Sequence, residues 1–231
     1  MTNLIAAAAA FLLIHLLVSG TRLRDALVRT LGQGAYMGLY SLASIALLTW
    51  MGCAYAAAQR GPDPVYWSAT PATKWIQLGV TLIAFLLAIP GLATRNPTSV
   101  QGETLLERED VVQGVLRITR HPFLWGVALW AAGHLMVNGD LASLIFFGCL
   151  FGLAVLGPSS IDAKRKRALG DKWDAFARET SAVPFAAILQ GRQRLKLGEI
   201  GAWRLALAVI LWAGLLLAHP HLFGVSPLPW R

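Results

Sequence analysis

Three histidines lie in or beside long apolar segments of the chain. His15 is inside the uncharged run from residue 4 to residue 21, and His121 and His134 lie near the two ends of the stretch TRHPFLWGVALWAAGHLMVN. An ionisable residue within a membrane span is rare and marks a functional site by default. Because a neutral imidazole can accept a proton or bind a metal through a ring nitrogen, these histidines are candidate metal ligands.

His15 has polar neighbours spaced along one helical face. Ser19 and Arg22 follow it at spacings of four and seven residues, which place the three side chains on one side of a continuous helix. Arg22 would lie about 10 Å further along that face, at the membrane surface. This pattern suits a haem with an axial histidine in the membrane and a propionate paired with arginine. The alternative is a histidine that is hydrogen-bonded to a neighbouring helix.

His121 precedes a proline, and proline is favoured at the first position of a helix. The sequence therefore places His121 at the cap of a helix expected over 122–138. The partial positive charge of a helix N-terminus disfavours protonation of the imidazole. Arg117 and Arg120 stand beside it and could bind a carboxylate or a phosphate. The alternative is a capping histidine beside arginines that bind lipid headgroups.

His134 follows His121 by thirteen residues, which is about 20 Å and some 220° of rotation on one helix. The two cannot ligate one metal together unless the helix breaks near Gly126. A bis-histidine site would therefore pair His15 with one of them, and residue counting puts His15 between them, about 8 Å from His121 and about 11 Å from His134 in depth. Aromatic and apolar residues share the face of His134 and form a wall suited to a porphyrin or a long apolar substrate: Phe123, Val127 and Trp130.

The composition is that of a membrane protein. Of 231 residues, 56% are hydrophobic and 14% are charged, against about 25% charged in soluble domains. Long uncharged runs can each hold a span of about 17–25 residues, and helices satisfy the backbone in lipid. The sequence predicts an all-α polytopic membrane bundle forming a single domain over 1–231, with about six transmembrane helices over 4–20, 36–57, 75–93, 122–138, 141–159 and 203–219. The first run lacks a preceding basic region, so we expect it to be retained as a span.

Basic residues alternate between the connecting segments. The first, third and fifth loops carry most of the lysines and arginines, which predicts that these loops face the cytoplasm and both termini the outside. The net charge of +8 then reflects contact with anionic lipids and requires no nucleic acid. In the last of these loops, Leu169, Trp173 and Phe176 recur at helical spacing. This pattern predicts an amphipathic interfacial helix with its apolar side on the membrane, either as a surface linker or as a lid over a cofactor.

Two stretches resemble a known family. IHLLVSGTRLRDALVRTLGQGAY and ITRHPFLWGVALWAAGHLMVNGDLASLIFFG are similar to segments of the NnrU family, and the resemblance runs from about residue 4 to residue 200. It implies a multi-pass bacterial inner-membrane protein associated with nitrite and nitric oxide reductase in denitrification. A related eukaryotic and cyanobacterial enzyme, 15-cis-zeta-carotene isomerase, uses haem b held by histidines to isomerise a polyene.

The leading hypothesis is therefore a haem b protein that works as a redox-dependent isomerase or as a redox component beside a reductase partner. The resemblance points to His15, His121 and His134 as the histidines that could hold the iron. Candidate propionate partners and pocket walls are Arg22, Arg117, Arg120, Phe123, Trp125 and Trp130.

A second resemblance supports an alternative. RHP followed by a basic stretch ending in VPF is similar to the isoprenylcysteine carboxyl methyltransferases and phospholipid methyltransferases, in which RHP and a later Glu-Glu pair hold S-adenosylmethionine. Here the corresponding region is Ile161-Asp162-Ala163-Lys164, and the paired carboxylates are missing. In this alternative Arg120, His121 and Asp162 lie near the cofactor. A third hypothesis is a non-catalytic membrane accessory for reductase maturation.

Overall fold

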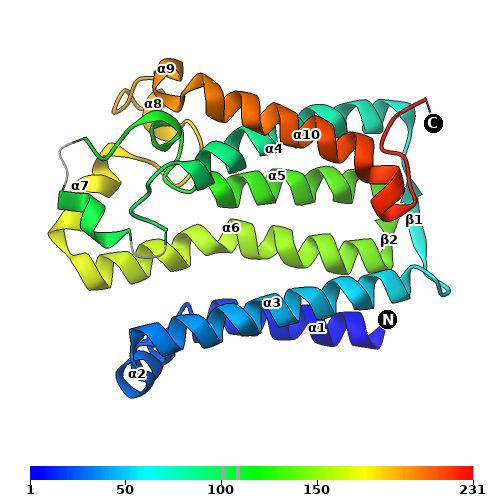
Figure 1. The fold of residues 1–231 in the computed structure, drawn as a ribbon, viewed down its shortest axis with the longest axis horizontal. Helices are drawn as coiled ribbons and strands as arrows, with labels where there is room; N and C mark the ends of the chain where they lie inside the picture. Colours follow the sequence, from blue (N-terminus) through cyan, green and yellow to red (C-terminus); the bar gives the residue numbers. More distant parts are fainter. Residues whose placement is uncertain (100–101, 108–109, 231) are drawn as a thin grey trace.

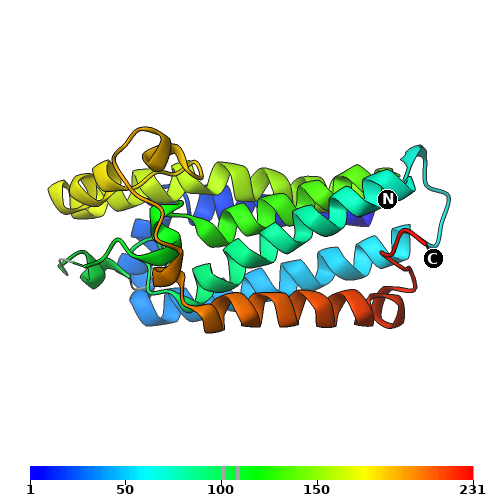
Figure 2. The same ribbon diagram turned by 90° about the horizontal axis from the view of Figure 1, so that it is seen from above.

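The computed structural model describes residues 1–99, 102–107 and 110–230. Long apolar helices run alongside one another in one elongated bundle (Figures 1 and 2). This confirms the predicted helical bundle. The long apolar helices are α1 (Thr2–Leu13), α3 (Gln33–Ala58), α4 (Pro71–Ala93), α5 (Pro122–Val137), α6 (Leu141–Leu169) and α10 (Ala202–Phe223).

Four of these helices, α3, α4, α6 and α10, are long and apolar enough to cross a membrane. A fifth candidate is the N-terminal segment, in which α1 continues into η1 (Ile14–Val18) and then bends into α2 (Arg22–Leu31). α5 is apolar but has 16 residues, which is just short of the roughly 17–25 residues of a typical membrane span. The chain is thus a membrane protein by helix length and composition, and the number of six spans stays a prediction.

The N-terminal helix does not run straight from His15 to Arg22. Residues Ile14–Val18 form a π-helix, and the chain then turns by 81° into α2, whose N-cap Thr21 accepts a hydrogen bond from the Leu23 amide. A sharp bend at a π-turn interrupts the regular succession of side chains along a helix. The prediction that His15 and Arg22 share one continuous face is therefore wrong.

Helices α5 and α6 form a helical hairpin. Their connection, β2 (Asn138–Asp140), pairs with β1 (Val65–Ser68) in a small antiparallel sheet that the all-α expectation missed. Gly139 is required there because a Cβ at this position would lie 2.2 Å from the Trp67 carbonyl oxygen. Asp140 caps α6 by accepting a hydrogen bond from the Ser143 amide.

Both termini lie at the same end of the bundle as this sheet, and α2, α7, α8 and α9 lie at the other end (Figure 1). The connections with the most basic residues therefore share one end, in agreement with the predicted alternation. Which end faces the cytoplasm remains a prediction. The short elements at that end are η2 (Glu103–Glu107), η3 (Gly114–Arg117), α7 (Asp171–Glu179), α8 (Ala186–Leu189) and α9 (Leu197–Ile200).

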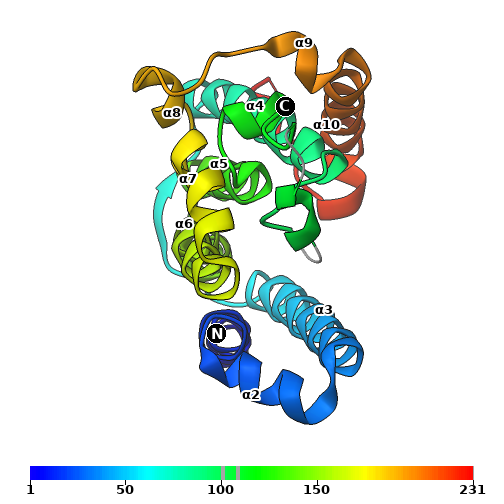
Figure 3. The same ribbon diagram turned by 90° about the vertical axis from the view of Figure 1, so that its left-hand side faces the viewer.

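Seen along the bundle, α1 and α3 lie on one side of α6, whereas α5, α4 and α10 follow on the other side (Figure 3). α4 and α5 approach closely at Gly126, where a Cβ would lie 2.6 Å from the Ala88 Cβ and 2.7 Å from the Ala84 carbonyl oxygen. A second core joins α1, α3 and α6 around Leu4, Met51 and Cys149.

The predicted amphipathic helix exists as α7, but its apolar side does not face lipid. Trp173 and Phe176 are only 2% and 3% exposed, because they pack against Val112 and its neighbours in the loop before α5. Gly170, with φ of 52°, separates α7 from the end of α6 at Leu169. The membrane-facing prediction is therefore wrong, and this helix holds two loops of the chain together.

Candidate functional site

His15 lies at the junction of α1 and η1, facing α3. Its Nδ1 is 2.8 Å from the Phe11 carbonyl oxygen, and its ring lies 4.3 Å from that of Phe11 and 5.6 Å from that of Tyr40, between centroids. A carbonyl oxygen can only accept, so Nδ1 carries the proton and Nε2 keeps its lone pair. A backbone hydrogen bond of this kind fixes the tautomer in which a histidine binds metal.

His134, on α5, shows the same arrangement as His15. Its Nδ1 is 2.8 Å from the Trp130 carbonyl oxygen, and its ring contacts Trp130 at 4.6 Å and stacks on Phe147 of α6 at 4.7 Å. The predicted partner Trp130 is therefore confirmed as a neighbour of His134. Phe147 was not anticipated, because nothing in the pair Phe146-Phe147 tells which ring faces α5. Two apolar helices thus each present an imidazole with its Nε2 lone pair available.

His121 is engaged differently. It is the N-cap of α5, as predicted, and is 2% exposed. Its Nε2 lies 2.8 Å from Asp162 Oδ1, and the Arg120 guanidinium donates to the same carboxylate, with Nε 3.0 Å from Oδ2. The structure brings together the residues that the methyltransferase alternative invokes, but they are bound to one another. A metal could reach this Nε2 only after the pair with Asp162 opens.

The backbone around Arg120 joins separate parts of the chain at this end of the bundle. The Arg120 carbonyl oxygen accepts from Asn96 Nδ2 at 2.9 Å, and the Arg120 amide donates to the Ser181 carbonyl oxygen at 2.9 Å. Thr119 Oγ1 donates to the Ala182 carbonyl oxygen at 2.7 Å. Because buried polar groups of this kind are satisfied by one another, the cluster around Asp162 fixes the loops onto α6.

Arg117 is bound by an acidic side chain that comes 82 residues later. Its Nε lies 2.7 Å from Glu199 Oε2, its Nη2 3.1 Å from Oε1, and its Nη1 2.6 Å from Gln193 Oε1. The Arg117 hydrogen bonds, with a further one from the Gly114 amide, lower the pKa of Glu199 to about 2. Glu199 was missed because no local pattern links positions so far apart in sequence.

The remaining predicted site residues lie apart from the histidines. Arg22 is exposed at the start of α2. Phe123 is 42% exposed on the surface of α5. Trp125 donates from Nε1 to the Ala182 carbonyl oxygen at 2.7 Å and packs with a core that includes Leu87. Of the three aromatic residues that were predicted to wall the pocket, Trp130 lies beside a candidate metal ligand, His134.

Helices α1 and α6 run parallel and in a fixed register. Cys149 Sγ lies 3.6 Å from the Ala8 carbonyl oxygen. Further along, a Cβ at Gly20 would lie 2.7 Å from Ser160 Oγ. With these two contacts, each residue of the N-terminal helix can be matched to the α6 residue that lies at the same depth in the bundle.

The three histidines lie at three depths in this register. His134 stacks on Phe147, which precedes Cys149 by two residues and so lies near the level of Ala6, and His15 is therefore about 13 Å further along the bundle. His121 contacts Asp162, about 10 Å beyond the level of His15. The order agrees with the predicted one. Within the described part of the chain, the three imidazoles share no hydrogen-bond partner, so each lies in its own cluster.

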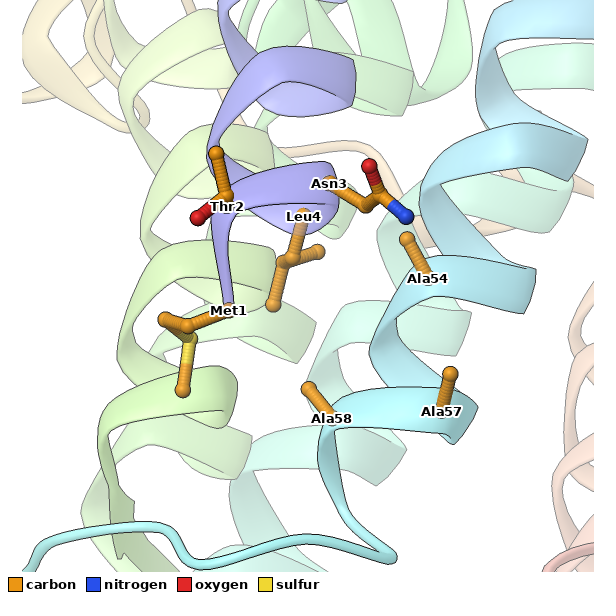
Figure 4. Close-up of a pocket in the computed structure, with 7 residues that line it drawn as sticks. All are labelled: Met1, Thr2, Asn3, Leu4, Ala54, Ala57 and Ala58. Carbon is orange, nitrogen blue, oxygen red and sulfur yellow. The ribbon is translucent and has the colours of Figure 1, made fainter.

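Two pockets accompany this arrangement. One, of about 280 Å³, lies between the start of α1 and the end of α3 (Figure 4) and is lined by Met1, Thr2, Asn3, Leu4, Ala54, Ala57 and Ala58. None of these side chains is a histidine, cysteine or carboxylate. The other, of about 190 Å³, lies between α4 and α5 and is lined by Ala84, Phe85, Ala88, Gly126, Val127 and Trp130. This second pocket is apolar and shares Trp130 with the cluster of aromatic rings around His134.

No three His, Cys, Asp or Glu side chains among the described residues are grouped to hold a bare metal ion. A haem requires fewer protein ligands, because the porphyrin supplies the equatorial nitrogens and the protein the axial ones. The donor set of isolated imidazoles therefore suits a porphyrin-bound metal better than a free one.

Two relatives share part of this chain. The 15-cis-zeta-carotene isomerase of Zea mays chloroplasts is 32% identical over 121 residues, which are 51% of this chain and 33% of the relative. The corresponding enzyme of Arabidopsis thaliana is 32% identical over 117 residues, 49% of this chain and 32% of the relative. The chain thus aligns with about a third of the length of these curated relatives. No solved structure matches it.

The family comparison covers far more of the sequence. The profile described as NnrU protein matches residues 3–227, which include all the apolar helices and all three candidate histidines. This chain therefore belongs to the NnrU family.

Proposed function

We propose that this protein binds haem b within the membrane and acts as a redox-dependent isomerase of an apolar polyene. The observation that carries the proposal is the state of His15, whose Nδ1 is held by the Phe11 carbonyl oxygen so that Nε2 remains a ligand. The similarity to 15-cis-zeta-carotene isomerases over about half of the chain supports the reaction class.

The residues present fit a haem. His15 would hold the iron, and bound haem would supply an electrophilic metal whose reduction changes its affinity for an axial ligand and for a double bond. His134 presents the same tautomer but lies about 13 Å deeper along the bundle. The two imidazoles are too far apart to bind one iron, so we assign His15 as its ligand and His134, which lies between Trp130 and Phe147, to the substrate side.

The aromatic group around His134 offers a surface for a conjugated chain. Trp130 and Phe147 flank the imidazole at 4.6 and 4.7 Å, and the apolar pocket of about 190 Å³ adjoins Trp130. Aromatic faces pack well against flat conjugated groups, and an apolar surrounding excludes water from the reacting bonds. In the proposal these residues orient the polyene.

The expected setting is a bacterial inner membrane with both termini on the periplasmic side, where a reductase of denitrification could be a partner. The basic end of the bundle, with α2 and α7 to α9, would then contact anionic lipids on the cytoplasmic side. A protein without haem would favour the alternative of a non-catalytic accessory.

The experiment that tests the reaction uses haem-loaded protein in liposomes that contain 15-cis-zeta-carotene. Dithionite-reduced protein should convert the carotene to an isomer with altered absorption and retention on chromatography, and the oxidised protein should not. The matched control is His134→Phe, which should retain haem and lose conversion. Equal conversion by reduced, oxidised and haem-free protein would reject the redox-dependent role of haem, and no conversion by the reduced haem-loaded protein would reject the reaction class.

The joined residues Arg120, His121 and Asp162 favour a second candidate, an S-adenosylmethionine-dependent methyltransferase. Against it, Asp162 already accepts hydrogen bonds from both neighbours. Calorimetry with S-adenosylhomocysteine separates the two functions, since a methyltransferase binds this product and an isomerase does not.

A further inference from the structure

The corner between η1 and α3 contains a buried hydroxyl group that lacks an acceptor. Tyr36, in the first turn of α3, is 4% exposed, and its hydroxyl makes no hydrogen bond of normal geometry within the described residues, although the Ser19 side chain lies close enough to interact with it. Buried hydroxyl groups are normally satisfied, so an unsatisfied one calls for an explanation. The Arg24 guanidinium carbon of α2 lies 5.7 Å from the centroid of the same ring. A buried phenol and a partly exposed guanidinium are therefore neighbours at this corner.

This place is connected to His15 through aromatic contacts. The Tyr36 ring stacks on Tyr40 with centroids 5.8 Å apart and planes 22° apart. Tyr40 in turn meets His15 edge-on at 5.6 Å. Ser19, which follows His15 by one turn, lies near both tyrosine side chains. The 81° bend after η1 is what folds α2 back so that Arg24 reaches this cluster.

We propose that Arg24 and the Tyr36 hydroxyl bind a propionate carboxylate of the haem whose iron is held by His15. The inference rests on the proposed function and names residues that the sequence pattern did not single out. A carboxylate accepts hydrogen bonds from a guanidinium and a phenol together, and such charge-assisted bonds are the strong ones. It would supply the acceptor that the Tyr36 hydroxyl lacks.

The other arginines considered for this role are less suited to it. Arg22 is exposed at the helix start, Arg117 is bound by Glu199, and Arg120 is bound by Asp162. Arg24 contacts Asp25 through one nitrogen at 3.4 Å, and the Asp25 side chain is 49% exposed. A single long contact to an exposed neighbour leaves most of the guanidinium donors able to bind a second carboxylate.

The test compares haem b with its dimethyl ester, which keeps the porphyrin and iron but lacks both carboxylates. Wild type, Arg24→Gln, Tyr36→Phe and the matched control Arg22→Gln are loaded with each, and haem loss to an excess of a haem-scavenging globin is followed by absorbance. With haem b, Arg24→Gln should lose haem roughly tenfold faster or more, Tyr36→Phe several-fold faster, and Arg22→Gln at the wild-type rate. With the ester, all four proteins should lose it at one common fast rate.

The midpoint potential gives a second readout. Positive charge near the propionates favours the more negative, reduced haem, so Arg24→Gln should lower the potential, with a tenfold shift of the redox ratio equal to about 59 mV for one electron. Equal behaviour of Arg24→Gln and Arg22→Gln, or ester loss that still depends on Arg24, would overturn the inference while leaving the haem site intact. Wild type that binds neither compound would overturn the haem function and this inference together.

Discussion

The imidazole Nε2 of His121 lies 2.8 Å from Asp162 Oδ1, across 41 positions of the chain. This contact links the N-cap of α5 to the C-terminal part of α6. The RHP sequence therefore connects these two helices. Arg120 donates to the same carboxylate. The pair therefore accounts for the position of His121 at the end of the bundle.

Removal of the Asp162 carboxylate should lower the stability of the protein and should have little effect on His15 and His134 in the membrane. Asp162→Asn leaves the buried Arg120 guanidinium without its counter-charge, and breaking a buried pair in this way costs about 3 kcal/mol of unfolding free energy. The measurement is unfolding in detergent, with Asp171→Asn at an exposed position as control. An equal loss of stability in the two variants would show that the joint has no structural role.

Acid should weaken the contact between η3 and α9. The pKa of Glu199 is lowered from 4.5 to about 2, chiefly by hydrogen bonds from Arg117, so its contribution to stability is present above pH 4.5 and is lost as pH falls towards 2. Glu199→Gln should therefore lower the Tm relative to wild type by a constant amount above pH 4.5, and the difference should shrink between pH 4.5 and pH 2. Thermal unfolding across this range checks it, with Glu179→Gln, at an exposed position, as control. A pH-independent difference would contradict the assignment.

The buried face of α7 predicts different behaviour for two tryptophans. Trp173 is 2% exposed and Trp203 on α10 is 59% exposed. Trp173→Ala should reduce the free energy of unfolding by about 3–5 kcal/mol, whereas Trp203→Ala should change it by about 0.5 kcal/mol or less. In single-tryptophan variants, brominated lipids should quench the fluorescence of Trp203 and spare that of Trp173. Strong quenching of Trp173 by the brominated lipids would show that the apolar side of α7 faces the membrane.

Much of the architecture was predictable from the sequence because uncharged runs have few ways to fold in a bilayer. The helices fall close to the expected ranges, and the hairpin at Asn138–Asp140 follows from its turn residues. The bend after His15 has a weaker signal, since no proline marks it and a π-turn has no simple sequence signal, and only the Ser19-Gly20 pair before the Thr21 cap indicates a break.

The site was predicted less well for physical reasons that differ between residues. His121 at the helix cap follows from the proline beside it. The acceptors of Arg117 and Arg120, in contrast, are Glu199 and Asp162, and contacts between residues so far apart depend on tertiary packing. For α7, periodicity showed that one side is apolar, but periodicity does not tell whether lipid or protein covers that side.

The close approach of α4 and α5 predicts opposite effects of the same substitution at two glycines. At Gly126 a methyl group would meet Ala88 Cβ at 2.6 Å, whereas Gly148 has nothing within 4 Å. Gly126→Ala should lower the free energy of unfolding by about 1–3 kcal/mol through overpacking. Gly148→Ala should raise it by up to about 1 kcal/mol through helix propensity. Thermal unfolding of the two variants checks the signs, and stabilisation by Gly126→Ala would contradict the packing.

The central claim is that His15 holds haem b, and absorption spectroscopy of the detergent-purified protein tests it most directly. Protein expressed with ample haem, with His15→Ala, His121→Ala and His134→Ala alongside, is measured oxidised and dithionite-reduced. A Soret band that His15→Ala abolishes, and that His121→Ala and His134→Ala retain, is the result expected from the geometry of the three imidazoles. A wild-type protein without a Soret band, or a His15→Ala variant that keeps an unchanged one, would contradict the claim.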